Sequence, residues 1–204
     1  MFFFIFYLIT LSYLLGMILW SALCMKDKFN FGTVCVSNLG NKHRNPTGYK
    51  GFWWGFGISG FLVFPHLIAF YPVINAISPM FAMVILIGSL IGAIGMSGVG
   101  FVNEVDQFKP HFVLGVCFFL GFGIAILATM LLFLIQIVNQ ATWPSLGEFV
   151  FVFVPLLCAF LYILYRLAFK PKGLPNMNKI EWVLLGIVLY WNLAMNGIFM
   201  NVIF

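Results

Sequence analysis

MFAMVILIGSLIGAIGMSGVGFV, residues 80–102, is the stretch of sequence that decides the fold. It contains no charged side chain, and as a helix rising about 1.5 Å per residue it can cross the roughly 30 Å of hydrocarbon in a bilayer. Gly88, Gly92 and Gly95 lie along one face of that helix. Because apolar burial does not drive helix association in lipid, such small residues indicate close helix packing. The stretch therefore predicts a membrane-spanning helix at the centre of a bundle, with these three glycines as packing residues.

Composition extends this prediction to the whole chain. Of its 204 residues, 63% are hydrophobic and only 7% are charged, whereas soluble domains carry about 25% charged residues. The mean hydropathy is +1.09. A spanning helix uses about 20 mostly apolar residues, so the hydrophobic content suffices for about six. These values exclude a soluble enzyme, a disordered tail and a nucleic-acid-binding domain. They predict an all-α polytopic integral membrane protein with six transmembrane helices in one bundle.

Proline-containing and charged connections separate the apolar runs and give the predicted boundaries. Pro72 and Pro79 bracket one connection, and Lys109-Pro110 marks the next. We expect a single transmembrane domain over residues 1–204. Its predicted helices lie at about residues 1–24, 52–71, 80–102, 112–137, 149–169 and 182–204.

The basic residues indicate how the bundle is oriented. All ten lie on one side of the six predicted helices: Lys26, Lys28, Lys42, Arg44, Lys50, Lys109, Arg166, Lys170, Lys172 and Lys179. The positive-inside rule therefore predicts cytoplasmic loops at residues 25–51, 103–111 and 170–181, with both termini outside the cytoplasm. A multi-pass protein of the cell membrane is the first interpretation, and an organelle inner membrane is the alternative.

Polar residues in two cytoplasmic loops form the first candidate site. They are Ser37, His43, Asn45, Glu104, Asp106 and His111. We expect loops 25–51 and 103–111 to adjoin, with His43 or Asn45 in contact range of Glu104, Asp106 or His111. The alternative is that the acids pair with Lys109 and the basic loop as solvated charges. The spacing of these residues matches no strong metal motif, and the four cysteines have no zinc-site spacing. We therefore predict no metal and no cofactor.

Three polar residues inside predicted helices form a second candidate group, because polar side chains within a bilayer are costly. His66, in Phe64-Pro65-His66, is either a proton carrier or ligand contact, or a neutral histidine bonded to a carbonyl that Pro65 leaves free. Asn192 and Asn196 lie one helical turn apart and share a face. They are expected to form hydrogen bonds between helices, or alternatively to line a polar pocket.

Short motifs resemble those of one group of membrane proteins. They are Ser37-Asn38-Leu39-Gly40, Asn45-Pro46, and Gly98-Val99-Gly100-Phe101 followed by acids and His111. Over about residues 35–125 the chain resembles an uncharacterised prokaryotic six-helix family related to the fibroblast-growth-factor-receptor-activating and damage-regulated autophagy modulator proteins. The resemblance implies six helices, with Ser37, Gly40, Asn45, Pro46 and His111 at matching positions. It also implies a link to lipid-anchor remodelling and autophagy in eukaryotic relatives.

Together these observations predict an integral membrane protein that recognises a lipid or a membrane partner through loops 25–51 and 103–111. Its expected partners are membrane lipids and, as an alternative, other membrane protein subunits, but not nucleic acid. Three rival functions stay open. The first is a non-catalytic subunit of a larger membrane complex. The second is a lipid-modifying enzyme that uses Glu104, Asp106 and His111, and the third is a small transporter that uses His66 and Asn192. Standard hydrolase, ATPase and metalloprotease motifs are absent from the sequence.

Overall fold

The computed structural model describes residues 2–25, 29–139, 145–169 and 174–203, and over these residues it is helical with no strand. In chain order the elements are α1 (Phe2–Leu23), η1 (Ser37–Gly40), α2 (Tyr49–Leu62), α3 (Phe64–Ile77), α4 (Pro79–Phe101), α5 (Phe108–Val138), α6 (Leu146–Phe169) and α7 (Leu174–Ile203).

Six helical spans in the described chain are long and apolar enough to cross a membrane, and α2 and α3 together make the second of them. This confirms the predicted all-α bundle of six transmembrane helices. The helices nevertheless run past several predicted ends, because proline does not always stop a helix. Pro72 lies inside α3, as transmembrane helices tolerate. Pro110 lies in the first turn of α5, where its missing N–H has no intrahelical partner to lose.

The helix ends differ from prediction in four of the six spans, and in one of them α6 begins at Leu146 rather than at 149. The second span extends from Tyr49 to Ile77 rather than over 52–71, and extended Ser78 separates it from α4. The helix α5 begins at Phe108 rather than at 112. The last helix begins at Leu174 rather than at 182, so Glu181 belongs to α7 and not to a loop.

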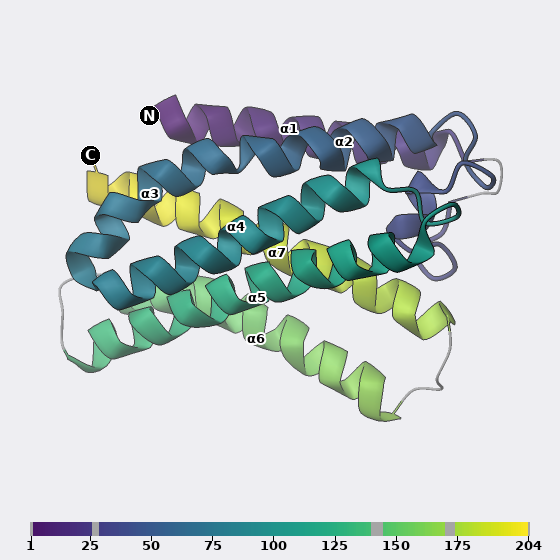
Figure 1. The fold of residues 1–204 in the computed structure, drawn as a ribbon. Coiled ribbons are helices and arrows are strands. Elements are labelled where there is room, and N and C mark those ends of the chain that lie inside the picture. Colours follow the sequence, from purple (N-terminus) through teal and green to yellow (C-terminus); the bar gives the residue numbers. More distant parts are fainter. Residues whose placement is uncertain (1, 26–28, 140–144, 170–173, 204) are drawn as a thin grey trace.

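The helices lie roughly side by side (Figure 1). We name one end of the bundle the loop end, because it carries loop 1 (residues 29–48) and the α4–α5 connection, and the other the terminal end, where α1 begins and α7 ends. The six described basic residues all belong to the loop end: Lys42, Arg44, Lys50, Lys109, Arg166 and Lys179. Among the described residues, Glu148 is the only charged one at the terminal end. Which side of the membrane the loop end faces stays a prediction.

The centre of the bundle is α4, which packs most extensively against α5 and next against α2. The two faces of α4 are built from small residues. A Cβ atom on Gly95 would lie 2.7 Å from the carbonyl oxygen of Leu114 in α5, and one on Gly88 would lie 2.9 Å from that of Gly121. A Cβ atom on Gly92 would meet the ring of Phe122. Gly88, Gly92 and Gly95, the three glycines predicted as packing residues, therefore all face α5 and let the two helices approach closely.

The opposite face of α4 meets α2 in a similar way. A Cβ atom on Gly100 would overlap the backbone of Gly57, and the hydroxyl of buried Ser97 donates a hydrogen bond of 2.9 Å to the Gly57 carbonyl oxygen. In contrast, α6 buries few described side chains, chiefly Val152, Leu156 and Ile163, and packs mainly against α7. The bundle is therefore tightest along α2, α4 and α5.

We predict that Gly95→Ala lowers the stability of the protein in detergent. The new methyl group would overlap backbone atoms of α5, and overpacking costs about 1–3 kcal/mol. Gly123→Ala is the matched control, because a Cβ atom there has nothing within 4 Å. Alanine should leave stability unchanged or raise it by up to about 1 kcal/mol through helix propensity. Thermal unfolding followed by circular dichroism measures both, and equal midpoints for the two variants would contradict the close packing of α4 on α5.

Candidate functional site

Loop 1 is a folded cap whose shape depends on one buried side chain. Asn45 is fully buried, and its amide nitrogen donates to the carbonyl oxygen of Ser21 at 2.9 Å and to that of Leu39 at 3.0 Å. Its amide oxygen accepts the backbone N–H of Gly48 at 3.0 Å. The hydroxyl of Ser21 donates in turn to the Leu39 carbonyl oxygen at 3.1 Å. Asn45 therefore ties α1, η1 and the start of α2 together.

Contacts with two other segments hold this cap over the loop end. The side chain of Asn103 donates to the Gly40 carbonyl oxygen at 3.0 Å, and Lys42 forms an ion pair with Asp106. On the other side, the indole nitrogen of Trp182 in α7 donates to the Val34 carbonyl oxygen at 2.8 Å. Loop 1 is thus attached to the α4–α5 connection and to α7.

A polar cavity of about 300 Å³ opens where loop 1 meets the α4–α5 connection. We call it the polar chamber. Its polar and charged lining residues are Lys42, Tyr49, Asn103, Glu104, Asp106, Gln107 and His111. Phe52 and Trp53 of α2 and Phe101 of α4 also line it.

A second cavity, of about 490 Å³, adjoins the polar chamber and is mostly apolar. We call it the apolar groove. It lies between the loop-end halves of α5 and α7, with Phe112, Phe119 and Leu120 on one side and Ile180 and Leu184 on the other. Glu104, His111, Phe52 and Val99 line both cavities. The two cavities therefore meet at a carboxylate and an imidazole.

The polar end of the apolar groove carries a second carboxylate. Glu181 of α7 accepts the backbone N–H of Ser37 at 3.2 Å and the Ser37 hydroxyl at 3.4 Å, and it lies within electrostatic range of Glu104 and His111. One oxygen of Glu104, Oε2, is buried without a hydrogen-bond partner among the described residues. The Nδ1 atom of His111 lies 2.7 Å from the Val102 carbonyl oxygen. Because a carbonyl only accepts, Nδ1 must carry a hydrogen.

The structure brings together four of the six residues predicted for this site. Glu104 and His111 line both cavities, Asp106 lines the polar chamber, and Ser37 lines the apolar groove. The expected contact between loops exists, but through Lys42 and Gly40. Among the described residues, no hydrogen bond or ion pair joins His43 or Asn45 to Glu104, Asp106 or His111. His43 is exposed and lines neither cavity, and Asn45 faces Ser21 as a structural residue.

Sequence reasoning missed Glu181 and the side chains of Asn103 and Gln107. The sequence predicts a loop at Glu181, because the predicted last helix begins one residue later, at 182. One signal was available: Glu181 directly precedes the predicted helix 182–204, and a carboxylate at the edge of a membrane-spanning segment is a functional candidate. No cluster of three or more His, Cys, Asp or Glu that could hold a metal is found among the described residues.

The predicted intramembrane residues lie elsewhere. His66 is buried in α3, and neither of its ring nitrogens has a hydrogen-bond partner among the described residues. The expected bond to a carbonyl left free by Pro65 is therefore not formed. The amides of Asn192 and Asn196 donate to carbonyl oxygens one turn back in α7, at 2.9 and 2.7 Å, rather than between helices as expected. Asn192 and His66 line the same two small cavities.

Comparisons with known proteins add no assignment: no family model, no curated protein and no solved structure matches the chain. The resemblance carried by residues 35–125 stays a prediction. The function must therefore be argued from the geometry of the site.

We predict that Asn45→Ala destabilises the protein by about 1–3 kcal/mol or more. The change leaves the buried Gly48 N–H without its acceptor and removes both bonds to carbonyl oxygens, and an unsatisfied buried group costs about that much. His43→Ala, two residues away and exposed, should change stability by less than about 0.5 kcal/mol. Chemical unfolding in detergent compares the two. If both variants unfolded like the parent, Asn45 would not organise loop 1.

A second prediction concerns Cys35, whose Sγ lies 3.1 Å from the Ser37 hydroxyl. Burial, and then the negative charges of Glu181 and Glu104, raise the pKa of the Cys35 thiol to about 11. In a variant with the other three cysteines replaced by alanine, the alkylation rate should rise with a midpoint near that pH. Glu181→Gln removes a negative charge and should lower the midpoint, because the thiolate then meets less repulsion.

Glu148→Gln is the control for this measurement, because Glu148 lies in the first turn of α6 and lines neither the polar chamber nor the apolar groove. It should leave the midpoint unchanged. A midpoint near the ordinary thiol pKa of about 8.5 in the parent would contradict the position of Cys35 beside the two acids.

Proposed function

We propose that this protein binds a membrane phospholipid whose head group carries a primary ammonium, as in phosphatidylethanolamine. One hydrocarbon chain would lie in the apolar groove and the head group in the polar chamber. The observation that carries the proposal is the junction of the two cavities. A polar cavity of about 300 Å³ and an apolar one of about 490 Å³ share Glu104 and His111, and both volumes are typical of ligand sites.

The position of the apolar groove favours a lipid chain as its occupant. The groove lies between membrane-spanning helices, where hydrocarbon is the solvent. Its outer wall includes Phe108, Phe112 and Leu120, whose side chains are exposed on the lateral surface. A chain can therefore enter sideways from the bilayer without leaving an apolar environment.

The charges at the junction favour an ammonium over an anionic head group. Glu104 has an unpartnered buried oxygen, and Glu181 lies close enough to interact with it. Two neighbouring carboxylates would repel a phosphate, whereas an ammonium offers three N–H donors and a compensating charge. A trimethylated ammonium has no N–H and cannot make these hydrogen bonds.

The phosphate of such a lipid also finds a partner at the rim of the polar chamber. Lys42 lines the chamber and is paired with Asp106, and both side chains are partly exposed. A lysine ammonium has three donors, so it can bind a phosphate oxygen while keeping its ion pair. Basic residues near a bilayer surface also attract anionic groups by about 1 kcal/mol each.

The experiment is native mass spectrometry of the delipidated protein with added lipid. We expect phosphatidylethanolamine to bind more tightly than phosphatidylcholine of the same chains. The double variant Glu104→Gln, Glu181→Gln should reduce this preference about tenfold or more. A hydrogen bond to a charged group contributes about 1.5–3 kcal/mol, and about 1.4 kcal/mol is a factor of ten.

Two further variants separate the head group from the chain. Gly115→Leu should weaken both lipids alike, because Gly115 lines the groove and its Cβ would have room, with the nearest atom 3.9 Å away. Glu148→Gln, at the terminal end, should change nothing. Equal binding of the two lipids by the parent would overturn the proposal. So would a loss of preference in Glu148→Gln as large as that in the double variant Glu104→Gln, Glu181→Gln. Tighter binding of phosphatidylglycerol than of phosphatidylethanolamine would contradict the ammonium preference and indicate that the site takes an anionic head group.

A further inference from the structure

A second polar region lies inside the bundle, around the break in the second span. The helix α2 ends at Leu62 and α3 begins at Phe64, with Pro65 in its first turn. His66 follows and is 2% exposed. The ring centroids of Phe6 and Tyr7 each lie 5.3 Å from its ring centroid. An imidazole is thus enclosed by aromatic rings within the membrane-spanning part of the chain.

Several polar atoms here lack hydrogen-bond partners within the described part of the chain. They are both ring nitrogens of His66, the hydroxyl of Ser59 and the indole nitrogen of Trp191. Ser59 is 1% exposed and Trp191 is 5% exposed. Buried polar groups are almost always hydrogen-bonded, to protein or to ordered water. Four unpartnered atoms on three neighbouring side chains therefore point to a bound ligand.

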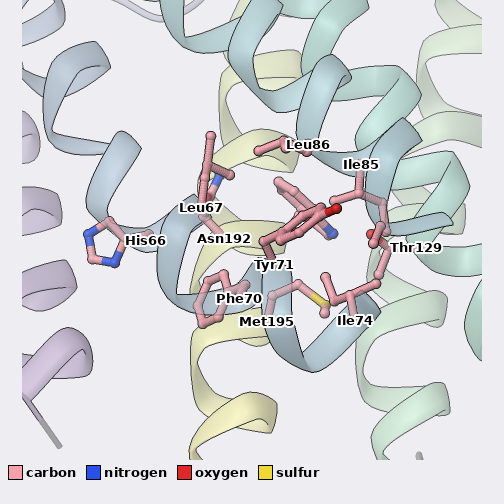
Figure 2. Close-up of a pocket in the computed structure, with 12 residues that line it drawn as sticks. His66, Leu67, Phe70, Tyr71, Ile74, Ile85, Leu86, Thr129, Asn192 and Met195 are labelled. Atoms are coloured by element: carbon pink, nitrogen blue, oxygen red, sulfur yellow. The ribbon is translucent and has the colours of Figure 1, made fainter. Parts of the chain in front are cut away.

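These side chains line two small cavities. One, of about 30 Å³, is lined by His66, Ser59, Tyr7 and Thr10, and the other, also of about 30 Å³, by His66, Trp191, Tyr71 and Thr129. Asn192 lines both. Figure 2 shows the second cavity, with His66 at the α1 side of α3 and Thr129 across the cavity on α5. His66 lines both cavities and therefore connects them.

We propose that these cavities are internal hydration sites, each holding water bonded to His66 or its unpartnered neighbours. A water molecule needs about 10–15 Å³ of such space and two to four polar partners, and each cavity meets both requirements. In the first, His66 and the Ser59 hydroxyl serve as partners. In the second, Trp191 donates its N–H, and Asn192 has a side-chain oxygen that can accept.

The occupant is water rather than an ion or a larger solute. Neither cavity is lined by a carboxylate or a cationic lysine or arginine, so an ion would meet no opposite charge. By the same measure, each volume has room for about two water molecules and for no larger polar solute. Water can also act as donor to one partner and acceptor from another, which matches the mixture of an indole N–H, a hydroxyl and imidazole nitrogens.

The test uses magic-angle-spinning NMR of the ¹⁵N-labelled full chain in lipid bilayers, with magnetisation transferred from water. We expect the Trp191 indole N–H and a His66 ring N–H to receive water magnetisation several-fold faster than the backbone amide of Ala93. Ala93 is fully buried in α4, so its amide gives the rate of transfer expected where no water is nearby. Transfer to both side chains at the Ala93 rate would overturn the proposal.

A cavity-filling variant makes the test specific to one site. Ala82 is buried and lines only the Trp191 cavity of the two. Ala82→Val should reduce the transfer of water magnetisation to Trp191 several-fold. The transfer to His66 from the Ser59 cavity should stay unchanged. Unchanged transfer to Trp191 in the folded variant would contradict the assignment of water to that cavity. If the variant does not fold, the comparison with Ala93 in the parent decides the proposal alone.

Discussion

Close backbone approach along α4 is the interaction on which the rest of this bundle depends. Lipid tails are as apolar as leucine, so burial alone cannot hold helices together in a bilayer, and packing of small residues must contribute. Gly95 and Gly88 bring α4 against α5, and Gly100 brings it against α2. Because these contacts fix where α4 ends and α5 begins, they also fix the short connection that carries Glu104. The candidate site is in this sense a product of glycine packing.

Loop 1 completes the site because a polar cap at a membrane surface must satisfy its own backbone groups. Asn45 does this internally, by bonding to carbonyl oxygens of Ser21 and Leu39. The cap then reaches the other elements through Trp182 and through the ion pair of Lys42. The contacts that order loop 1 therefore also enclose the polar chamber and fix its position.

Hydropathy predicted the six spans because each must be apolar over its whole length, and this property is local in sequence. The helix ends were less predictable, since Pro72 and Pro110 read as breaks although both positions tolerate proline. In the site, Glu104 and His111 were predictable because they flank the ends of adjacent helices. The direction of a loop side chain has no such periodic rule, so Asn45 was misassigned. Glu181 was missed because its proximity depends on how α7 packs.

The two polar regions of the bundle are separated by a row of packed aromatic rings. Phe118 lines the apolar groove, and its ring lies 5.8 Å from that of Phe122, which lines the Ser59 cavity. Phe122 in turn lies 6.3 Å from Trp191, which lines the other small cavity. An occupant of the groove would thus touch one side of this row, while the proposed waters lie on the other. This row of ring contacts therefore stands between the proposed amphiphile at the loop end and the proposed waters at the centre. Because close-packed rings leave no room for water between them, we expect no continuous water path along this row from the groove to either small cavity.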